Sequence, residues 1–170
     1  IQQYSYTTGK NATDSAMIID AMDILHDNKV DGFCIVSSDS DFTRLATRLR
    51  ESGKLVIGIG EKKTPKPFIV ACDKFIYIEI ISNIEPPKPS FSDSSFNKGY
   101  NRFDKTDSRL IRLIKSSIED LADDNGWAFL AEVGALIIKK KPDFDPRNYG
   151  FNKLTPLIKS LSKHFIVDER

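Results

Sequence analysis

Two aspartates, Asp39 and Asp41, lie close together in the stretch Ile35-Val-Ser-Ser-Asp-Ser-Asp-Phe, directly after a continuous apolar run. A short apolar run of this kind predicts a strand that is buried on both faces. In an open α/β sheet, ligands bind beyond the carboxyl ends of the strands, which is where these carboxylates would lie. Mg²⁺ prefers such hard oxygen ligands and takes one or two carboxylates from a protein. The pair is therefore a candidate metal-binding and catalytic site.

Asp14 is a third candidate, because it opens a helical pattern that precedes the same strand. We expect it at the same edge of the sheet as Asp39 and Asp41. Three converging carboxylates could bind a metal ion, activate a water molecule and stabilise the charge of an attacked phosphodiester. A structural role competes with this interpretation, because aspartate is favoured at helix N-caps and in first helical turns. The residues themselves leave both interpretations open.

The same segment also spells a phosphohydrolase motif, Asp-x-Asp-x-Thr, in Asp39-Ser-Asp41-Phe-Thr43. In that class the first aspartate is a nucleophile that forms an aspartyl-phosphate, and the second is the acid and base. Here two serines separate the strand from Asp39, and a short motif outside its usual context is weak support. We keep this function as a minor alternative.

Three lysines, Lys62, Lys63 and Lys66, lie in the loop after a second apolar run, Leu55–Gly60. A loop at the carboxyl end of that strand would face the same edge as Asp39. The lysines could therefore hold the phosphate backbone of an RNA beside the carboxylates. A solvated turn without a ligand explains them equally well.

Strands and amphipathic helices alternate over residues 1–82. We expect strands at Gln2–Thr7, Gly32–Ser37, Leu55–Gly60 and Phe75–Ile81, and helices from Asp14, over Asp41–Glu51 and over Phe68–Cys72. Alternation at these lengths predicts an α/β domain, a parallel sheet with flanking helices and right-handed crossovers.

The composition changes near residue 83, where three prolines and four serines follow within twenty residues. We interpret residues 83–107 as a linker. Residues 108–170 then predict a small winged-helix-like α+β domain with a closing strand at Phe165–Val167. Its first helix would be capped by Thr106 or Ser108. Its second would span Trp127–Ile138, with Trp127, Leu130, Val133 and Leu136 in the core, and its third would lie over Leu154–Leu161.

The composition excludes several classes of protein. The net charge is +1, so the chain as a whole is not a polybasic polyanion binder, and no apolar run is long enough for a membrane span. Two cysteines and two histidines cannot supply a disulfide framework or a closed zinc site. Cys34 and Cys72 lie in apolar runs, which indicates buried thiols in a reducing, cytoplasmic setting. Because the chain opens with Ile1 rather than Met, we expect further sequence upstream.

The first region resembles an NYN domain of the LabA-like group, a relative of the PIN-like nucleases. The resemblance covers nearly all of residues 1–82 and is carried by Lys10-Asn-Ala-Thr-Asp14-Ser-Ala-Met-Ile-Ile-Asp20-Ala, Val36-Ser-Ser-Asp39-Ser-Asp41-Phe42 and Ala71-Cys-Asp-Lys-Phe75. It implies a PIN-like, Rossmann-like fold and a ribonuclease in which Asp14, Asp39 and Asp41 bind Mg²⁺ or Mn²⁺. The family has one more aspartate on a first strand, in a stretch such as Asp-Gly-x-Asn. This chain has no such stretch, so we expect that strand to be missing from it.

The second region resembles an OST-HTH, or LOTUS, domain over residues 108–170. The resemblance is carried by Gly126-Trp127-Ala-Phe129-Leu130-Ala-Glu-Val133-Gly134-Ala-Leu136 and Tyr149-Gly150-Phe-Asn-Lys153-Leu154-Thr-Pro-Leu157. It implies RNA binding or the docking of a protein partner. Lys140 and Lys153 are our candidates for contact with RNA phosphates.

We therefore expect a metal-dependent endoribonuclease joined to an RNA-binding module. The alternative is a regulatory or scaffold protein that binds RNA without cleaving it.

Overall fold

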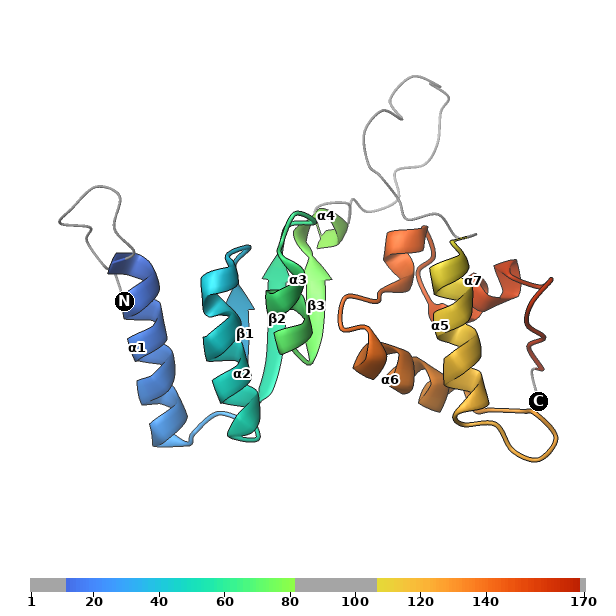
Figure 1. Ribbon diagram of the computed structural model, residues 1–170, viewed down its shortest axis with the longest axis horizontal. Helices are drawn as coiled ribbons and strands as arrows, with labels where there is room; N and C mark the ends of the chain where they lie inside the picture. The colour runs from blue at the N-terminus through green and yellow to red at the C-terminus, as the bar shows by residue number, and fades with distance from the viewer. Residues whose placement is uncertain (1–11, 82–106, 169–170) are drawn as a thin grey trace, which may run out of the picture. The chain divides into compact units, whose positions relative to one another are not determined.

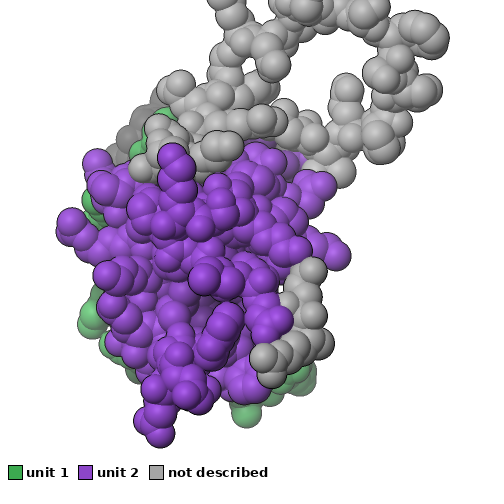
Figure 2. Space-filling model, turned by 90° about the vertical axis from the view of Figure 1, so that its right-hand side faces the viewer, with its two compact units in different colours: residues 1–75 green, residues 76–170 purple. Residues whose placement is uncertain are grey.

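The computed structural model describes residues 12–81 and 107–168. The strand expected at Gln2–Thr7 and nearly all of the expected linker lie outside the described residues. The chain divides into two compact units, residues 1–75 and 76–170 (Figure 2). Each is described by itself below.

The first unit is built on a parallel sheet, as the alternation of elements predicts. Its elements in chain order are α1 (Ala12–Asp27), β1 (Gly32–Val36), the 3-10 turn η1 (Ser40–Phe42), α2 (Thr43–Glu51), β2 (Leu55–Gly60), α3 (Lys66–Ala71) and β3 (Lys74–Tyr77), whose last two residues fall in the second unit. The strands lie in the order β1-β2-β3 and point the same way (Figure 1). β1 and β2 pair in parallel from Gly32 opposite Leu55 to Val36 opposite Ile59.

The core of this unit lies between the sheet and the two helices that connect its strands. The expected stripe of α2 is confirmed, because Leu45 and Leu49 are both buried. Phe68 of α3 meets Phe75 of β3 edge to face, with ring centroids 6.0 Å apart. Such a pair stabilises the packing beyond the area that it buries. The core therefore fixes β2 and its neighbours, whose carboxyl ends carry the candidate site.

β1 is less buried than we expected. It is an edge strand of the described sheet, and its residues on one face, Cys34 and Val36, are exposed, whereas Ile35 on the other face is buried. The expectation of cover on both faces is therefore wrong, and so is that of a buried Cys34. Cys72 is buried, as expected, and both cysteines are free thiols.

The strand expected over Phe75–Ile81 is wrong in its second half. β3 ends at Tyr77, and residues Ile78–Ile81 form a single helical turn, α4. A short apolar run without alternation does not distinguish a strand from a buried helical turn, which explains the error.

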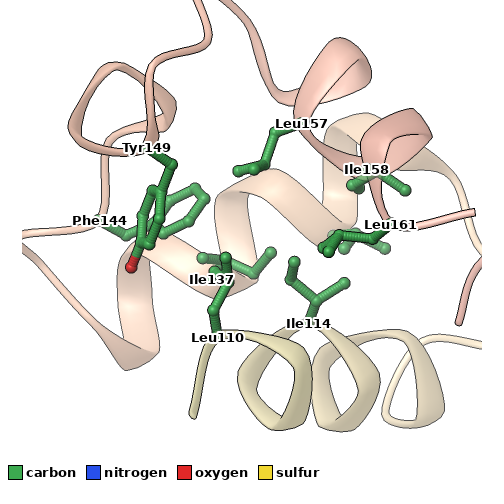
Figure 3. Packing of buried hydrophobic residues seen from close by; sticks show 9 residues of the cluster. Leu110, Ile114, Ile137, Phe144, Tyr149, Leu157, Ile158 and Leu161 are labelled. Carbon is green, nitrogen blue, oxygen red and sulfur yellow. The ribbon is translucent and has the colours of Figure 1, made fainter. Parts of the chain in front are cut away.

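Residues 107–168 of the second unit contain helices and no strand. These helices are α5 (Ser108–Glu119), α6 (Leu130–Lys140), the 3-10 turn η2 (Pro146–Tyr149) and α7 (Leu154–Ser160). The N-cap of α5 is Asp107, whose Oδ1 accepts the backbone N–H of Arg109 at 2.9 Å, so Ser108 is the first residue of the helix rather than its cap. Thr106, the other expected cap, lies outside the described residues. Figure 3 shows the core that these elements enclose, which comprises Leu110, Ile114, Val133, Ile137, Phe144, Tyr149, Leu157, Ile158 and Leu161.

Two expectations for this unit are corrected. Residues Phe165–Val167 form no strand. α6 begins at Leu130 rather than at Trp127, and Trp127 is 48% exposed instead of belonging to the core. Val133 is buried, whereas Leu130 and Leu136 are half-buried. Within the described parts of the chain, no helix is both long and apolar enough to cross a membrane.

Candidate active-site edge

The carboxyl end of β1 leads into a tight turn that carries Asp39 and Asp41. The backbone N–H of Ser37 donates to the carbonyl of Ile59 at 2.9 Å, which continues the pairing of the two strands one residue beyond β1. Asp39 is extended (φ −92°, ψ 134°), and its Oδ1 accepts the backbone N–H of Asp41 at 2.9 Å. Asp39 is thus the N-cap of η1, so the structural role considered for this residue is present.

Phe42 anchors the turn in the hydrophobic core. It is buried, whereas its neighbour Asp41 and the cap residue Asp39 are both exposed. The hydroxyl of Thr43, the first residue of α2, donates to the carbonyl of Ser40 and so links η1 to α2. A buried ring next to two exposed acids holds both carboxylates at the surface of the sheet edge.

Two serines tie the turn to its surroundings. The hydroxyl oxygen of Ser37 accepts the N–H of Asp39 at 3.1 Å, and that of Ser38 accepts the N–H of Glu61 at 2.8 Å. The second bond joins the end of β1 to the end of β2. We did not single out these serines from the sequence. The sequence contains a signal for the first bond, because serines beside aspartates favour such local side-chain to backbone bonds.

Gly60 is the second feature that the sequence did not reveal. A Cβ atom at this position would lie 2.4 Å from the carbonyl oxygen of Ser37 and 2.8 Å from the hydroxyl of Thr64. Thr64 is buried and donates both its N–H and its hydroxyl to the carbonyl of Glu61, at 2.9 and 2.6 Å. The absence of a side chain at Gly60 therefore lets this loop fold against the turn after β1.

The loop that carries Lys62, Lys63 and Lys66, called the lysine loop below, is joined to the turn after β1 by the hydrogen bond from Glu61 to Ser38. Lys63 pairs with Glu61 at 2.9 Å, and this hydrogen bond raises the pKa of the Lys63 ammonium. Lys66 is exposed at the start of α3, and Lys62 is half-buried. The carboxylates and the lysines therefore lie on two loops that are hydrogen-bonded to each other after β1 and β2.

Asp14 lies half-buried in the first turn of α1. Among residues 12–81 and 107–168, no three His, Cys, Asp or Glu side chains lie close enough together to hold a metal ion. The structure thus brings Asp39 and Asp41 together but does not add Asp14 to them as a third ligand. Two exposed carboxylates are as many as Mg²⁺ often takes from a protein, although one oxygen of Asp39 already accepts a hydrogen bond. The assignment of a metal to these residues stays a prediction.

The basic candidates of the second unit differ in how exposed their side chains are and in whether they are already paired with an acid. Lys140 binds Asp120 at 2.7 Å and the hydroxyl of Ser116 at 3.1 Å, and its side chain is only 28% exposed. Lys153 is exposed immediately before α7. Arg147 forms two hydrogen bonds with the carboxylate of Asp145, at 2.9 and 2.7 Å, which raise its pKa. Of the two lysines, Lys153 is therefore the more accessible.

Comparison with known proteins identifies both halves of the chain. The model of the NYN domain family matches residues 1–79, and that of the OST-HTH/LOTUS domain family matches residues 101–170. No curated protein and no solved structure matches the chain. An NYN domain is thus followed by an OST-HTH/LOTUS domain in this chain, a combination that supports an RNA-related role as a nuclease or as a binding protein.

Proposed function

We propose that the chain is a divalent-metal-dependent endoribonuclease whose second domain binds the RNA. One observation carries the proposal. Asp39 and Asp41 are both exposed on a turn at the carboxyl end of β1, and this turn is hydrogen-bonded to the lysine loop. That edge is where parallel α/β sheets bind their ligands.

In this proposal the carboxylates of Asp39 and Asp41, with Asp14 as the third candidate, hold Mg²⁺ or Mn²⁺. Such an ion, when bound, supplies an activated water molecule for attack on a phosphodiester. The ammonium groups of Lys63 and Lys66 hold the RNA backbone. An RNA phosphate competes with Glu61 for Lys63, because the two exposed side chains form a pair that water and salt already weaken.

The OST-HTH/LOTUS domain contributes to RNA binding through exposed cations such as Lys153. Lys140 contributes less, because its ammonium group is occupied by Asp120 and Ser116. Backbone contacts of this kind carry affinity rather than sequence preference. We also propose a cytoplasmic location, since both cysteines are free thiols, as is usual in a reducing compartment.

A second function, RNA binding without cleavage, is favoured by the hydrogen bonds of Asp39. Its carboxylate already has a structural task as the cap of η1, and the described residues form no three-carboxylate group. A regulatory or scaffold protein would need only the lysines and the second domain.

The substitution Asp39→Asn separates the two functions. Asparagine keeps an Oδ1 acceptor for the N–H of Asp41, so the turn is preserved, whereas the negative charge is lost. We expect Mn²⁺-dependent cleavage of a labelled single-stranded RNA by the full-length protein to be abolished. RNA affinity, measured by fluorescence anisotropy in EDTA, should not fall, because a repulsive charge is removed.

The matched control is Asp23→Asn, which removes one exposed aspartate of α1 outside the turn. It should cleave at the rate of the unmodified protein. Cleavage by the Asp39→Asn protein at the unmodified rate, above that of a mock preparation, would refute the site. RNA binding without metal-dependent cleavage by the unmodified protein would support the scaffold function instead.

A further inference from the structure

The turn that joins α5 to α6 exposes two large aromatic side chains that the function proposed above does not use. Trp127 is 48% exposed and Phe129 is 78% exposed. Phe129 stands at the N-cap position of α6, directly before Leu130, where the helix begins. Tryptophan and phenylalanine are enriched at protein–protein interfaces, which makes these two exposed rings a candidate contact surface.

The position of Trp127 is fixed by its own turn. The Oδ1 atom of Asp123 accepts the N–H groups of Asn125 and Trp127, at 3.0 and 2.9 Å. The N–H of Asp123 in turn donates to the carbonyl of Trp127 at 2.8 Å, and Gly126 completes the turn with a φ of +81°. The backbone of Trp127 is thus held in a closed turn, so a partner that binds the indole has less backbone to order.

The charged residues along this stretch of the chain are of one sign. Residues 123–132 contain three acids, Asp123, Asp124 and Glu132, all of them exposed, and no Lys, Arg or His. The ammonium group of Lys140 pairs with Asp120, three residues before this stretch, so its charge is already compensated. An RNA phosphate would therefore be repelled at this turn, whereas a cationic partner would be attracted.

We propose that residues 123–132, the acidic aromatic turn, dock a lysine- or arginine-containing segment of a partner protein that also carries an apolar anchor. The cations of that segment meet Asp124 and Glu132 and the face of the Trp127 indole, which attracts cations. Its apolar residue packs against Phe129. The second domain then has two separate tasks, because its exposed lysines serve RNA and this turn serves a protein.

Trp127 is the only tryptophan of the chain, so its fluorescence reports directly on this turn. The test titrates the full chain with a short peptide in which arginines flank two leucines, and follows the tryptophan emission. A second titration uses a single-stranded RNA whose binding is followed independently by anisotropy. We expect the peptide to shift the emission to shorter wavelength, and the RNA to bind without shifting it.

Two variants keep the tryptophan and the turn. Asp124→Lys reverses one charge, and Phe129→Ser removes the second ring; each should weaken peptide binding about tenfold, the loss typical of an important interface side chain. The matched controls are Asp23→Lys and Val70→Ser, which change an exposed acid and an exposed apolar residue of the first unit. Both should bind the peptide as the unmodified chain does.

The proposal is overturned if the peptide leaves the emission unchanged, or if the RNA shifts it and competes with the peptide. It is also overturned if the emission depends on protein concentration alone, because a second copy of the chain would then cover the turn. None of these outcomes depends on RNA cleavage, so the result stands apart from the nuclease proposal.

Discussion

At the scale of single residues, the candidate site is held together by short polar side chains and one glycine. Ser37 and Ser38 bond to the backbone of Asp39 and of Glu61, and Gly60 leaves room for the carbonyl of Ser37. The two carboxylates are exposed, and that of Asp39 forms the N-cap of η1. The geometry of the acids therefore depends on neighbours that carry no charge.

The substitution Gly60→Ala tests this dependence. A Cβ atom 2.4 Å from the carbonyl of Ser37 meets backbone, which cannot rotate away, so the ends of β1 and β2 must separate. We expect the free energy of unfolding of the first unit to fall by about 1–3 kcal/mol, the usual cost of overpacking. Urea unfolding followed by circular dichroism measures the loss, and Mn²⁺-dependent RNA cleavage should fall with it.

Gly134→Ala is the matched control for that change. It lies inside α6, where a new Cβ would approach only the tip of the Leu154 side chain, at 3.1 Å. Because alanine favours a helix by about 1 kcal/mol over glycine, stability should be unchanged or higher. Equal stability of the Gly60→Ala and Gly134→Ala proteins would show that the crowding at Gly60 does not matter.

The two thiols should react at different rates. Cys34 is exposed on β1, whereas Cys72 is buried, and burial raises its pKa to about 11. Only the thiolate reacts, so Cys72 stays protonated and protected at pH 8, and its reactivity rises only as the pH approaches that value. Ellman's reagent should modify one thiol per native chain and two in urea. In a Cys34→Ser protein the fast reaction should disappear; a fast reaction that persists would contradict the exposure of Cys34.

At the scale of elements, the sequence predicted those whose apolar pattern comes with clear boundaries. The strands β1 and β2 were found because their short apolar runs are bounded by glycine or serine, and α2 because its apolar residues recur at helical spacing. The apolar residues of Ile78–Ile81 and of Phe165–Val167 fit either a strand or another conformation. Which conformation they adopt depends on their tertiary surroundings. The exposure of Cys34 also depends on what covers the sheet, which local pattern does not encode.

The candidate site was predicted in part for the same reason. Asp39 and Asp41 could be placed at the end of a strand because the apolar run before them fixes where that strand stops. The pairing of Ser38 with Glu61, and the close approach that excludes a side chain at Gly60, join two segments 23 residues apart. Such contacts follow from the register of β1 against β2, which a single sequence does not reveal.

The N-cap of α5 gives a prediction at this scale. Because Oδ1 of Asp107 accepts the N–H of Arg109, Asp107→Ala leaves that donor without its partner. We expect the second unit to lose about 1 kcal/mol of stability, as is typical when a cap is removed. Asp107→Asn keeps an acceptor and should lose less. A loss of the same size in Ser108→Ala would instead assign the cap to Ser108, one of the two residues expected from the sequence.

At the scale of the whole molecule, the net charge of +1 is a sum over regions that differ. Residues 1–80 contain 10 basic and 11 acidic side chains, whereas the remainder contains 15 and 13. Within the second domain the charge is divided again, between accessible lysines such as Lys153 and the acidic aromatic turn at residues 123–132. A near-neutral total is therefore compatible with RNA binding at one surface and repulsion at another.

The final prediction concerns the share of RNA binding that belongs to the second domain. Removing residues 108–170 should weaken binding of single-stranded RNA and flatten its dependence on salt, because fewer counterions are released when fewer phosphates are neutralised.

The intact chain with Lys153→Gln and Lys163→Gln should show the same direction of change without loss of the fold, since both side chains are exposed. Each phosphate that the protein no longer neutralises should lower the slope of log K against log salt by about 0.7 for a single strand. Lys140→Gln should change the slope less, because Asp120 already occupies that lysine. Anisotropy titrations at several salt concentrations measure these slopes. Equal affinity and slope in the truncated, doubly substituted and intact proteins would assign RNA binding to the NYN domain alone.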